Sequence, residues 1–230
     1  MSCIVHIETS TEVCSVALSQ DGALLSSKES FDGPSHGRLL AGFVDEMVSF
    51  ADSHAIPVDA VAVSCGPGSY TGLRIGASMA KGLCYGRGLK LLAVPTLQLL
   101  TVPLLLYRDD LPEEACFCPM IDARRMEVYS AIYRRNLTEV RETRADIVDE
   151  GSYAEFLEKG PVVFFGGGAA KCQTVLQHEN AIFIDDVLPL ARHMIPLAEK
   201  ALGQGKTEDV AYSEPFYLKD FVATKPKNLF

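Results

Sequence analysis

The chain has 230 residues, 48% of them hydrophobic, and a formal net charge of −9. This length is enough for one large domain or two small ones with a substantial core. The acidic balance argues against unaided binding to nucleic acid, because such binding depends on Lys and Arg side chains that neutralise phosphates.

The chain also lacks features of export or membrane insertion. Its N-terminus meets Glu8 before any long apolar run, which is not the pattern of a signal peptide. The most apolar stretch, residues 91–107, is interrupted by Pro95 and Pro103 and falls short of the roughly 20 residues that a membrane helix needs. Seven cysteines without a C-x-x-C pair indicate reduced thiols. We therefore expect a soluble, cytoplasmic protein that has no membrane partner.

The first half of the chain reads as three antiparallel strands followed by alternating helices and strands. Asp21-Gly22 is a strong hairpin signal between the second and third strands. The expected strands cover residues 3–9, 13–19, 23–31, 60–63 and 91–94, and the expected helices cover 36–55, 71–86 and about 96–107.

A charged, proline-containing break at residues 108–114 is the best domain boundary, and beyond it the pattern partly restarts. The expected strands there cover 116–122, 126–133, a segment from 138, 161–165 and 181–184, and the expected helices cover 152–159, 169–177 and 190–202. The sequence therefore predicts a duplicated α/β fold with two lobes, 1–107 and 108–230.

The helix expected over 36–55 has an unusually wide apolar stripe. One face carries Leu40, Val44, Met47 and Ala51, and the neighbouring face carries Leu39, Phe43 and Phe50. Two interpretations remain open. The helix is packed between two layers of its own domain, or it also faces a partner protein.

The helix expected over 71–86 has a different surface. Gly72, Gly76 and Ala80 lie four residues apart on one side, and Ile75, Met79 and Leu83 lie beside them. Small residues at this spacing allow another helix to approach closely. We therefore expect the two helices of the first half to pair and to leave apolar surface for a second pair.

The turn at Gly66–Gly72 joins a strand to this helix. It is not a P-loop, because no Gly-Lys-Ser/Thr follows, and Thr71 occupies the third glycine position of a dinucleotide fingerprint. Ser69 and Thr71 are both candidate N-caps. The turn is either an anion site at a helix N-terminus or a plain connection.

Weak candidates for nucleotide binding occur in both halves. Glu8, Thr9 and Ser10 follow the first strand and could position Mg²⁺ and a phosphate, while Gly166 and Gly167 lie between a strand and a helix. None of the five histidines has a second histidine at i+3 or i+4. The sequence therefore predicts no metal site and no catalytic set.

Four segments together are similar to the TsaB family, also called YeaZ, across almost the whole chain. They are residues 7–11 with the strand that follows, 66–76, 121–124 and 214–218. The resemblance implies the two-lobed α/β fold of actin, Hsp70 and sugar kinases (the ASKHA fold), with a mixed sheet flanked by helices in each lobe. It also implies a non-catalytic subunit of the machinery that makes N6-threonylcarbamoyladenosine in tRNA.

The resemblance further implies particular partners. Members bind TsaD through their first two helices, form homodimers through the same surface, and are joined by the ATPase TsaE. No cofactor is required, although an adenine nucleotide can bind near the TsaD junction, and tRNA is contacted only through the complex. The interface residues that it implies are His36, Leu39, Leu40, Phe43, Met47, Gly72, Ile75, Gly76, Met79, Ala80 and Leu83.

Three positions bear on this resemblance. The metal pair H-x-x-x-H of TsaD is incomplete here, because Leu40 follows His36 at that spacing. Glu8 replaces the usual Asp, and Gly37 replaces the usual Ser.

We therefore predict a partner protein that activates TsaD for threonylcarbamoyl transfer to adenosine 37 of tRNAs that read ANN codons. The alternative is an autonomous enzyme, either a nucleotide-dependent phosphotransferase of the same superfamily or a metallopeptidase.

Overall fold

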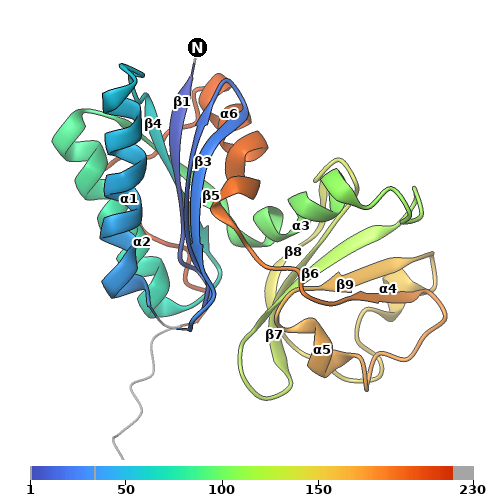
Figure 1. The fold of residues 1–230 in the computed structure, drawn as a ribbon. Helices are drawn as coiled ribbons and strands as arrows, with labels where there is room; N and C mark the ends of the chain where they lie inside the picture. The colour runs from blue at the N-terminus through green and yellow to red at the C-terminus, as the bar shows by residue number, and fades with distance from the viewer. Residues whose placement is uncertain (1, 34, 220–230) are drawn as a thin grey trace, which may run out of the picture.

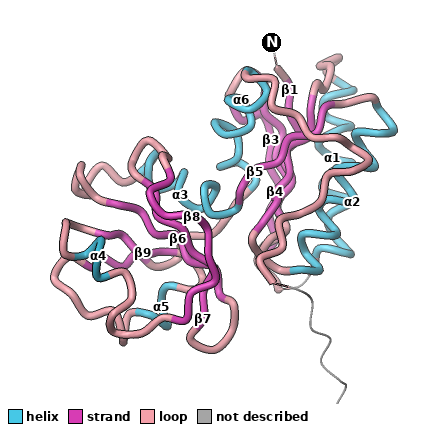
Figure 2. The backbone as a smooth tube through the Cα atoms, turned by 180° about the vertical axis from the view of Figure 1, so that it is seen from behind, coloured by secondary structure: helices cyan, strands magenta, loops and turns pink. Residues whose placement is uncertain are grey.

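The computed structural model describes residues 2–33 and 35–219, which form two lobes joined along one side (Figures 1 and 2). Within these residues each lobe contains a five-stranded sheet, with strand orders β3-β2-β1-β4-β5 and β10-β9-β6-β7-β8. In both sheets the first three strands are antiparallel and the remaining pairings are parallel. The strands β6 to β10 of the second sheet take the same places as β1 to β5 of the first, because β8-β7-β6-β9-β10 corresponds strand by strand to β3-β2-β1-β4-β5. This shared order matches the predicted duplication.

The elements agree closely with those expected from the sequence. The first lobe contains β1 (Cys3–Glu8), β2 (Cys14–Gln20), β3 (Ala23–Ser30), α1 (His36–Ser53), β4 (Ala60–Gly66), α2 (Tyr70–Arg87), β5 (Lys90–Pro95) and α3 (Thr96–Tyr107). Then follow β6 (Cys116–Asp122), β7 (Glu127–Tyr133), β8 (Glu139–Ile147), α4 (Ala154–Leu157), β9 (Val162–Phe165), α5 (Ala169–Cys172), β10 (Ala181–Ile184), the 3-10 turn η1 (Ala191–Met194) and α6 (Ile195–Gly203). None of the described helices is long and apolar enough to span a membrane.

The first sheet is covered on both faces. Alternate residues of β1 point to opposite sides, so that Val5 and Ile7 pack under α1 and α2 while Ile4 packs under α6. Figure 1 shows α1 and α2 on one side of this sheet and α6 on the other. The buried, nearly continuous apolar runs of β1 and β4 follow from this double covering.

Helix α3 connects the two lobes physically. Its leucines are distributed around the helix and not along one stripe, as expected for a helix that packs on two cores. Leu99 belongs to the core of the first lobe, whereas Leu97, Leu100 and Leu104 belong to that of the second. Each fully buried leucine contributes about 1.5–3 kcal/mol relative to an exposed one, so α3 holds the lobes together through its own packing.

The chain returns to the first lobe after β10. The division at residues 107 and 108 would place η1 and α6 in the second lobe, whereas Met194 and Ala198 pack with Ile4 and Leu92 of the first sheet. The physical reason is that the second face of the first sheet is apolar and needs a cover. A helical pattern at residues 190–202 does not reveal which sheet it covers.

Three expected helices are shorter than predicted, and the first of them, expected over 152–159, covers only Ala154–Leu157. The helix expected over 169–177 stops at Cys172, before the β-branched residues Thr174 and Val175, which favour helices less. The helix expected over 190–202 begins at Ile195, after the 3-10 turn. Pro196 lies in its first turn, where no backbone N–H is needed.

Glycines of the segment 66–76 allow α2 to pack closely against the turn between β1 and β2. An added Cβ would lie 2.4 Å from the Ser10 carbonyl oxygen at Gly68 and 2.0 Å from the Thr9 carbonyl oxygen at Gly72. At Gly76 it would lie 2.3 Å from Thr9 Oγ1. Gly72 and Gly76 therefore admit the turn at Thr9 and not another helix, which contradicts the expectation for these two residues, whereas the expected pairing of α1 with α2 is confirmed.

Hydrogen bonds fix the same contact. The backbone N–H of Ser69 donates to the Ser10 carbonyl at 2.7 Å, and Thr9 Oγ1 donates to the Gly72 carbonyl at 2.8 Å. Ser69 Oγ accepts from the Gly72 N–H at 3.2 Å, which confirms Ser69 as the N-cap. The start of α2 is thus occupied by the protein's own polar groups.

Gly72→Ala should destabilise the protein by more than about 3 kcal/mol, because its methyl group would overlap the Thr9 carbonyl. The matched control is Gly86→Ala in the same helix, where no atom lies within 4 Å. That variant should gain about 0.5–1 kcal/mol, because alanine is favoured over glycine inside a helix. Urea unfolding of both variants measures the difference, and equal effects would contradict the close contact.

Candidate partner-binding surface

Helices α1 and α2 lie beside each other on one face of the first sheet (Figures 1 and 2). Both have 18 residues, and both bury one side against the sheet. Apolar side chains that are only partly buried remain beside that buried side. We call the following six residues the helix surface: Leu39, Phe43, Phe50, Ile75, Met79 and Leu83.

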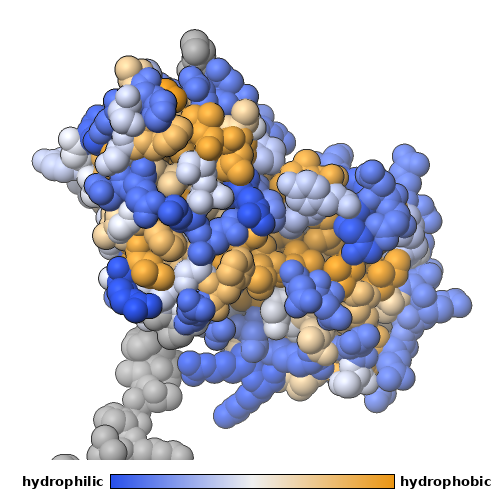
Figure 3. Space-filling model, viewed as in Figure 1, coloured by the Kyte–Doolittle hydropathy of each residue, from blue (hydrophilic) through white to orange (hydrophobic). Residues whose placement is uncertain are grey.

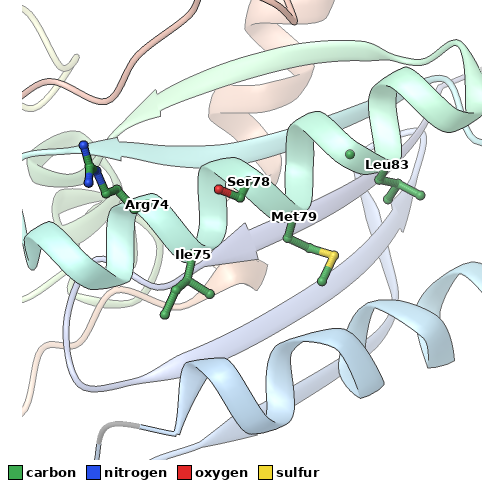
Figure 4. A pocket seen from close by; sticks show the side chains of 6 residues that line it. Arg74, Ile75, Ser78, Met79 and Leu83 are labelled. Carbon is green, nitrogen blue, oxygen red and sulfur yellow. The ribbon is translucent and has the colours of Figure 1, made fainter.

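Part of the helix surface forms a groove along α2. Its volume is about 670 Å³, and its lining is mostly apolar. The side chains of Ile75, Met79 and Leu83 project from α2 on the side of α1, while Arg74 and Ser78 project from the other side (Figure 4). The three apolar residues are spaced four apart and so form one continuous row.

Hydrophobic side chains also reach the molecular surface outside this groove. Figure 3 shows them gathered over the lower end of α1 and in a band along the junction of the two lobes. The groove has a charged residue at one end, since Arg74 is exposed there. Its guanidinium carbon lies 4.5 Å from the centroid of the Tyr70 ring, a cation–π contact.

The structure divides the interface residues implied by the sequence into two groups. Five of them are half-buried members of the helix surface: Leu39, Phe43, Ile75, Met79 and Leu83. The other six are buried within the lobe: His36, Leu40, Met47, Gly72, Gly76 and Ala80.

The buried group does not present side chains to a partner. Leu40 and Met47 are each only 1% exposed and belong to the core of the first lobe. His36 Nε2 donates to the Thr11 carbonyl at 2.8 Å and ties the start of α1 to the turn between β1 and β2. These buried residues fix the positions of the helices. The half-buried residues of the helix surface remain available for contact with a partner.

Sequence reasoning omitted Phe50, Arg74 and Ser78 from the interface. Phe50 follows Phe43 by seven residues, or two helical turns, and this spacing was the available signal. Arg74 and Ser78 had no such signal, because their position at the groove depends on how α2 is rotated against the sheet.

The first set of nucleotide candidates is sealed inside the first lobe. Glu8, Thr9 and Ser10 are all 0% exposed. Glu8 Oε1 accepts from both the backbone N–H and the Oγ of Ser10, and α2 covers the turn. These side chains therefore make their hydrogen bonds within the lobe, and they are not accessible to a nucleotide in this conformation.

The second set of nucleotide candidates, Gly166 and Gly167, forms the turn between β9 and α5. Gly166 has a φ of +94°, and an added Cβ there would lie 2.6 Å from the Met120 carbonyl oxygen. Gly167 is exposed and has open space around it. Among the described residues, no group of three or more His, Cys, Asp or Glu side chains is arranged to hold a metal ion.

Several titratable groups are buried in the first sheet or beside it. Burial raises the pKa of Glu8 to about 7, partly offset by its hydrogen bonds to Ser10. Its Oε2 has no hydrogen-bond partner among the described residues, which also favours the neutral acid. Burial lowers the pKa of His6 to about 3 and that of His193 to about 4.

The pKa of Glu8 predicts a pH-dependent stability. Between about pH 4.5 and 7 the unfolded chain releases this proton while the folded chain keeps it, so the free energy of unfolding falls as pH rises. The wild type should therefore lose up to about 3 kcal/mol relative to Glu8→Gln across this window. The contributions of His6 and His193 are common to both proteins and cancel in the difference.

Urea unfolding at pH 5, 6, 7 and 8 measures this difference. Glu113→Gln, at an exposed carboxylate, is the control and should remain parallel to the wild type. A difference between wild type and Glu8→Gln that stays constant from pH 5 to pH 7 would refute the raised pKa.

Comparison with known proteins identifies the family. A family model described as tRNA N6-adenosine threonylcarbamoyltransferase, TsaD, matches residues 33–227. The chain is 32% identical to the tRNA threonylcarbamoyladenosine biosynthesis protein TsaB of Escherichia coli K12, over 96% of each chain. The chain belongs to the TsaB family. The TsaB protein of Haemophilus influenzae is 28% identical over 96% of this chain and 95% of its own length.

Solved structures give the same result. YeaZ from Pseudomonas aeruginosa is 27% identical, with a TM-score of 0.76 over 95% of this chain and all of that chain. An uncharacterized Pseudomonas aeruginosa protein with similarity to peptidase YeaZ is 26% identical and has a TM-score of 0.81, with the same coverage.

A more distant match extends the likeness of fold. An inorganic polyphosphate/ATP-glucomannokinase from Arthrobacter sp. strain KM is 11% identical, with a TM-score of 0.51 over 89% of this chain and all of that chain. At this identity the match shows the fold alone. The predicted two-lobed α/β fold, similar to sugar kinases, is confirmed.

Proposed function

We propose that this chain is a non-catalytic subunit that binds a TsaD partner through the helix surface and thereby serves tRNA threonylcarbamoyladenosine biosynthesis. The observation that carries the proposal is the half-buried apolar row of Ile75, Met79 and Leu83 on α2, beside Leu39 and Phe43 on α1. The names of the relatives and the TsaD family model support the pathway.

The chemistry of this surface suits a helical partner. Rows of apolar side chains at a spacing of four residues receive the apolar stripe of another helix, and the groove along α2 gives a partner's side chains room to interdigitate with Ile75, Met79 and Leu83. Arg74 and Ser78 supply a polar edge, as is usual around the apolar centre of an interface. The rigid packing of α2 on the turn at Thr9 means that little of the surface has to be reorganised on binding.

In this proposal the subunit acts by stabilising the competent conformation of TsaD, which transfers threonylcarbamoyl to adenosine 37 of tRNAs that read ANN codons. The ATPase TsaE joins the assembled pair, and a homodimer of this chain competes for the same surface. The subunit needs no nucleotide of its own. An adenine nucleotide at the TsaD junction would bind outside the sealed turn of Glu8, Thr9 and Ser10.

The same burial disfavours the alternative of an autonomous phosphotransferase. An enzyme of that kind needs polar groups at the end of β1 that face its substrate, whereas here Glu8, Thr9 and Ser10 are 0% exposed and bonded internally.

Met79→Asp should weaken binding to the cognate TsaD by about 30-fold or more, because it places a charge in the apolar centre of the interface. Phe43→Asp should have a similar effect. Calorimetric titration of TsaD with each variant measures the affinity, and reconstituted tRNA modification should fall in parallel.

Leu106→Asp, at an exposed leucine of α3 outside the helix surface, is the matched control and should bind within about twofold of the wild type. Thermal melting of each variant shows that the lobe remains folded. Unchanged affinity of folded Met79→Asp and Phe43→Asp would eliminate the helix surface as the binding site, and modification that proceeds equally well without the chain would eliminate the function.

A further inference from the structure

The turn between β6 and β7 contains two solvent-exposed arginines. Arg124 and Arg125 are exposed, and both have a left-handed backbone, with φ of +69° and +51°. This conformation is uncommon for long side chains and is found where the surroundings fix it. Here the Asp122 carboxylate accepts from the Arg124 N–H at 2.8 Å, and the Ala123 N–H donates to the Glu127 carbonyl at 3.0 Å.

The guanidinium groups of these two arginines are not engaged by other side chains of the described residues. Neither makes a hydrogen bond or an ion pair with another described residue. The nearby acids are already paired, since Asp122 bonds Lys171 at 2.5 Å and Glu127 bonds Lys219. The turn is thus locally basic in a chain whose net charge is −9.

Two aromatic residues lie on a distant segment of the chain that reaches the turn. The segment at residues 216–219 links β4 to the turn, because the Phe216 N–H donates to the Cys65 carbonyl and Lys219 pairs with Glu127. Three residues span at most about 11 Å, so Phe216 lies within that reach of Lys219. Phe216 is 48% exposed.

A further cation extends the same region on the first lobe. The Tyr217 ring lies 5.0 Å from that of Tyr70, over which Arg74 is placed. Hydrophilic side chains project from the lower edge of the second lobe, over the β6–β7 turn (Figure 3). The segment at residues 216–219 thus carries aromatic side chains between Arg74 of the first lobe and the β6–β7 turn of the second.

We propose that the β6–β7 turn is a phosphate-binding contact for RNA, with Arg124 and Arg125 gripping the sugar-phosphate backbone. The RNA is identified as tRNA only through the proposed function, on which this part of the inference rests. A guanidinium fork matches phosphate oxygens in a bidentate manner, and the exposed Phe216 ring, on the segment that reaches the turn, offers stacking to an unpaired base.

The shape of the turn favours RNA over an acidic protein. Its two exposed side chains are charged and the exposed apolar surface beside it is limited to Phe216, whereas stable protein interfaces bury a larger apolar centre. Two arginines do not supply the whole affinity for a polyanion. They position an RNA that is held mainly by the partner subunit, which is compatible with the acidic balance of this chain.

The test uses the assembled complex of this chain with TsaD and the double variant Arg124→Gln/Arg125→Gln. Filter binding of labelled tRNA should weaken by about tenfold near 0.1 M salt, and the slope of log affinity against log salt should fall by about 1–2. The KM for tRNA should rise with little change in kcat. Arg124→Lys/Arg125→Lys should recover most of the salt slope, because the charge is restored.

The matched control is Arg144→Gln, at an exposed arginine on β8 of the same lobe, which should leave tRNA binding unchanged. Unchanged tRNA affinity and salt slope in the double variant would overturn the proposal. So would a loss of binding to TsaD with unaltered affinity for tRNA, which would assign the turn to an acidic protein partner.

Failure of this inference is separable from failure of the proposed function. The helix surface is tested by the assembly of Met79→Asp with TsaD, whereas the turn is tested by tRNA affinity of a complex that has assembled.

Discussion

The packing of α2 against the turn at Thr9 and Ser10 is the contact on which the first lobe depends. It is possible only because Gly68 and Gly72 have no side chain at the points of closest approach, where a Cβ would overlap a carbonyl oxygen. The contact has two consequences. It seals Glu8 and its neighbours inside the lobe, and it sets the rotation of α2 so that Met79 lies on the outer side.

The two lobes are joined by elements that do not belong to a single lobe in the sequence. Helix α3 is shared between both cores, and α6 crosses back to cover the first sheet. The last described segment crosses the first lobe too. Lys81 donates to the carbonyls of Ala211 and Ser213, and Lys219 pairs with Glu127 of the second lobe. The proposed partner surface and the proposed RNA contact thus lie on different lobes of one connected body.

Most of the fold could be predicted from local patterns. The buried strands are apolar runs bounded by turns, and the apolar periodicity of α1 and α2 placed both helices within two residues of their ends. The failures share one cause. The span of α5, the lobe covered by α6 and the neighbour of Gly72 all depend on contacts between residues far apart in the chain, which periodicity does not report.

The candidate site shows the same division. By itself the sequence determined the apolar rows of α1 and α2, the strand-to-helix glycine turn and, through its resemblance to the TsaB family, the family and the fold. Only the tertiary structure decided which residues of those rows are exposed, because burial depends on how each helix is rotated against the sheet. That rotation places Leu40 and Met47 in the core and leaves Ile75, Met79 and Leu83 along the groove. For α2, this rotation is set where the helix meets the turn at Thr9, because Gly72 has no side chain at that point.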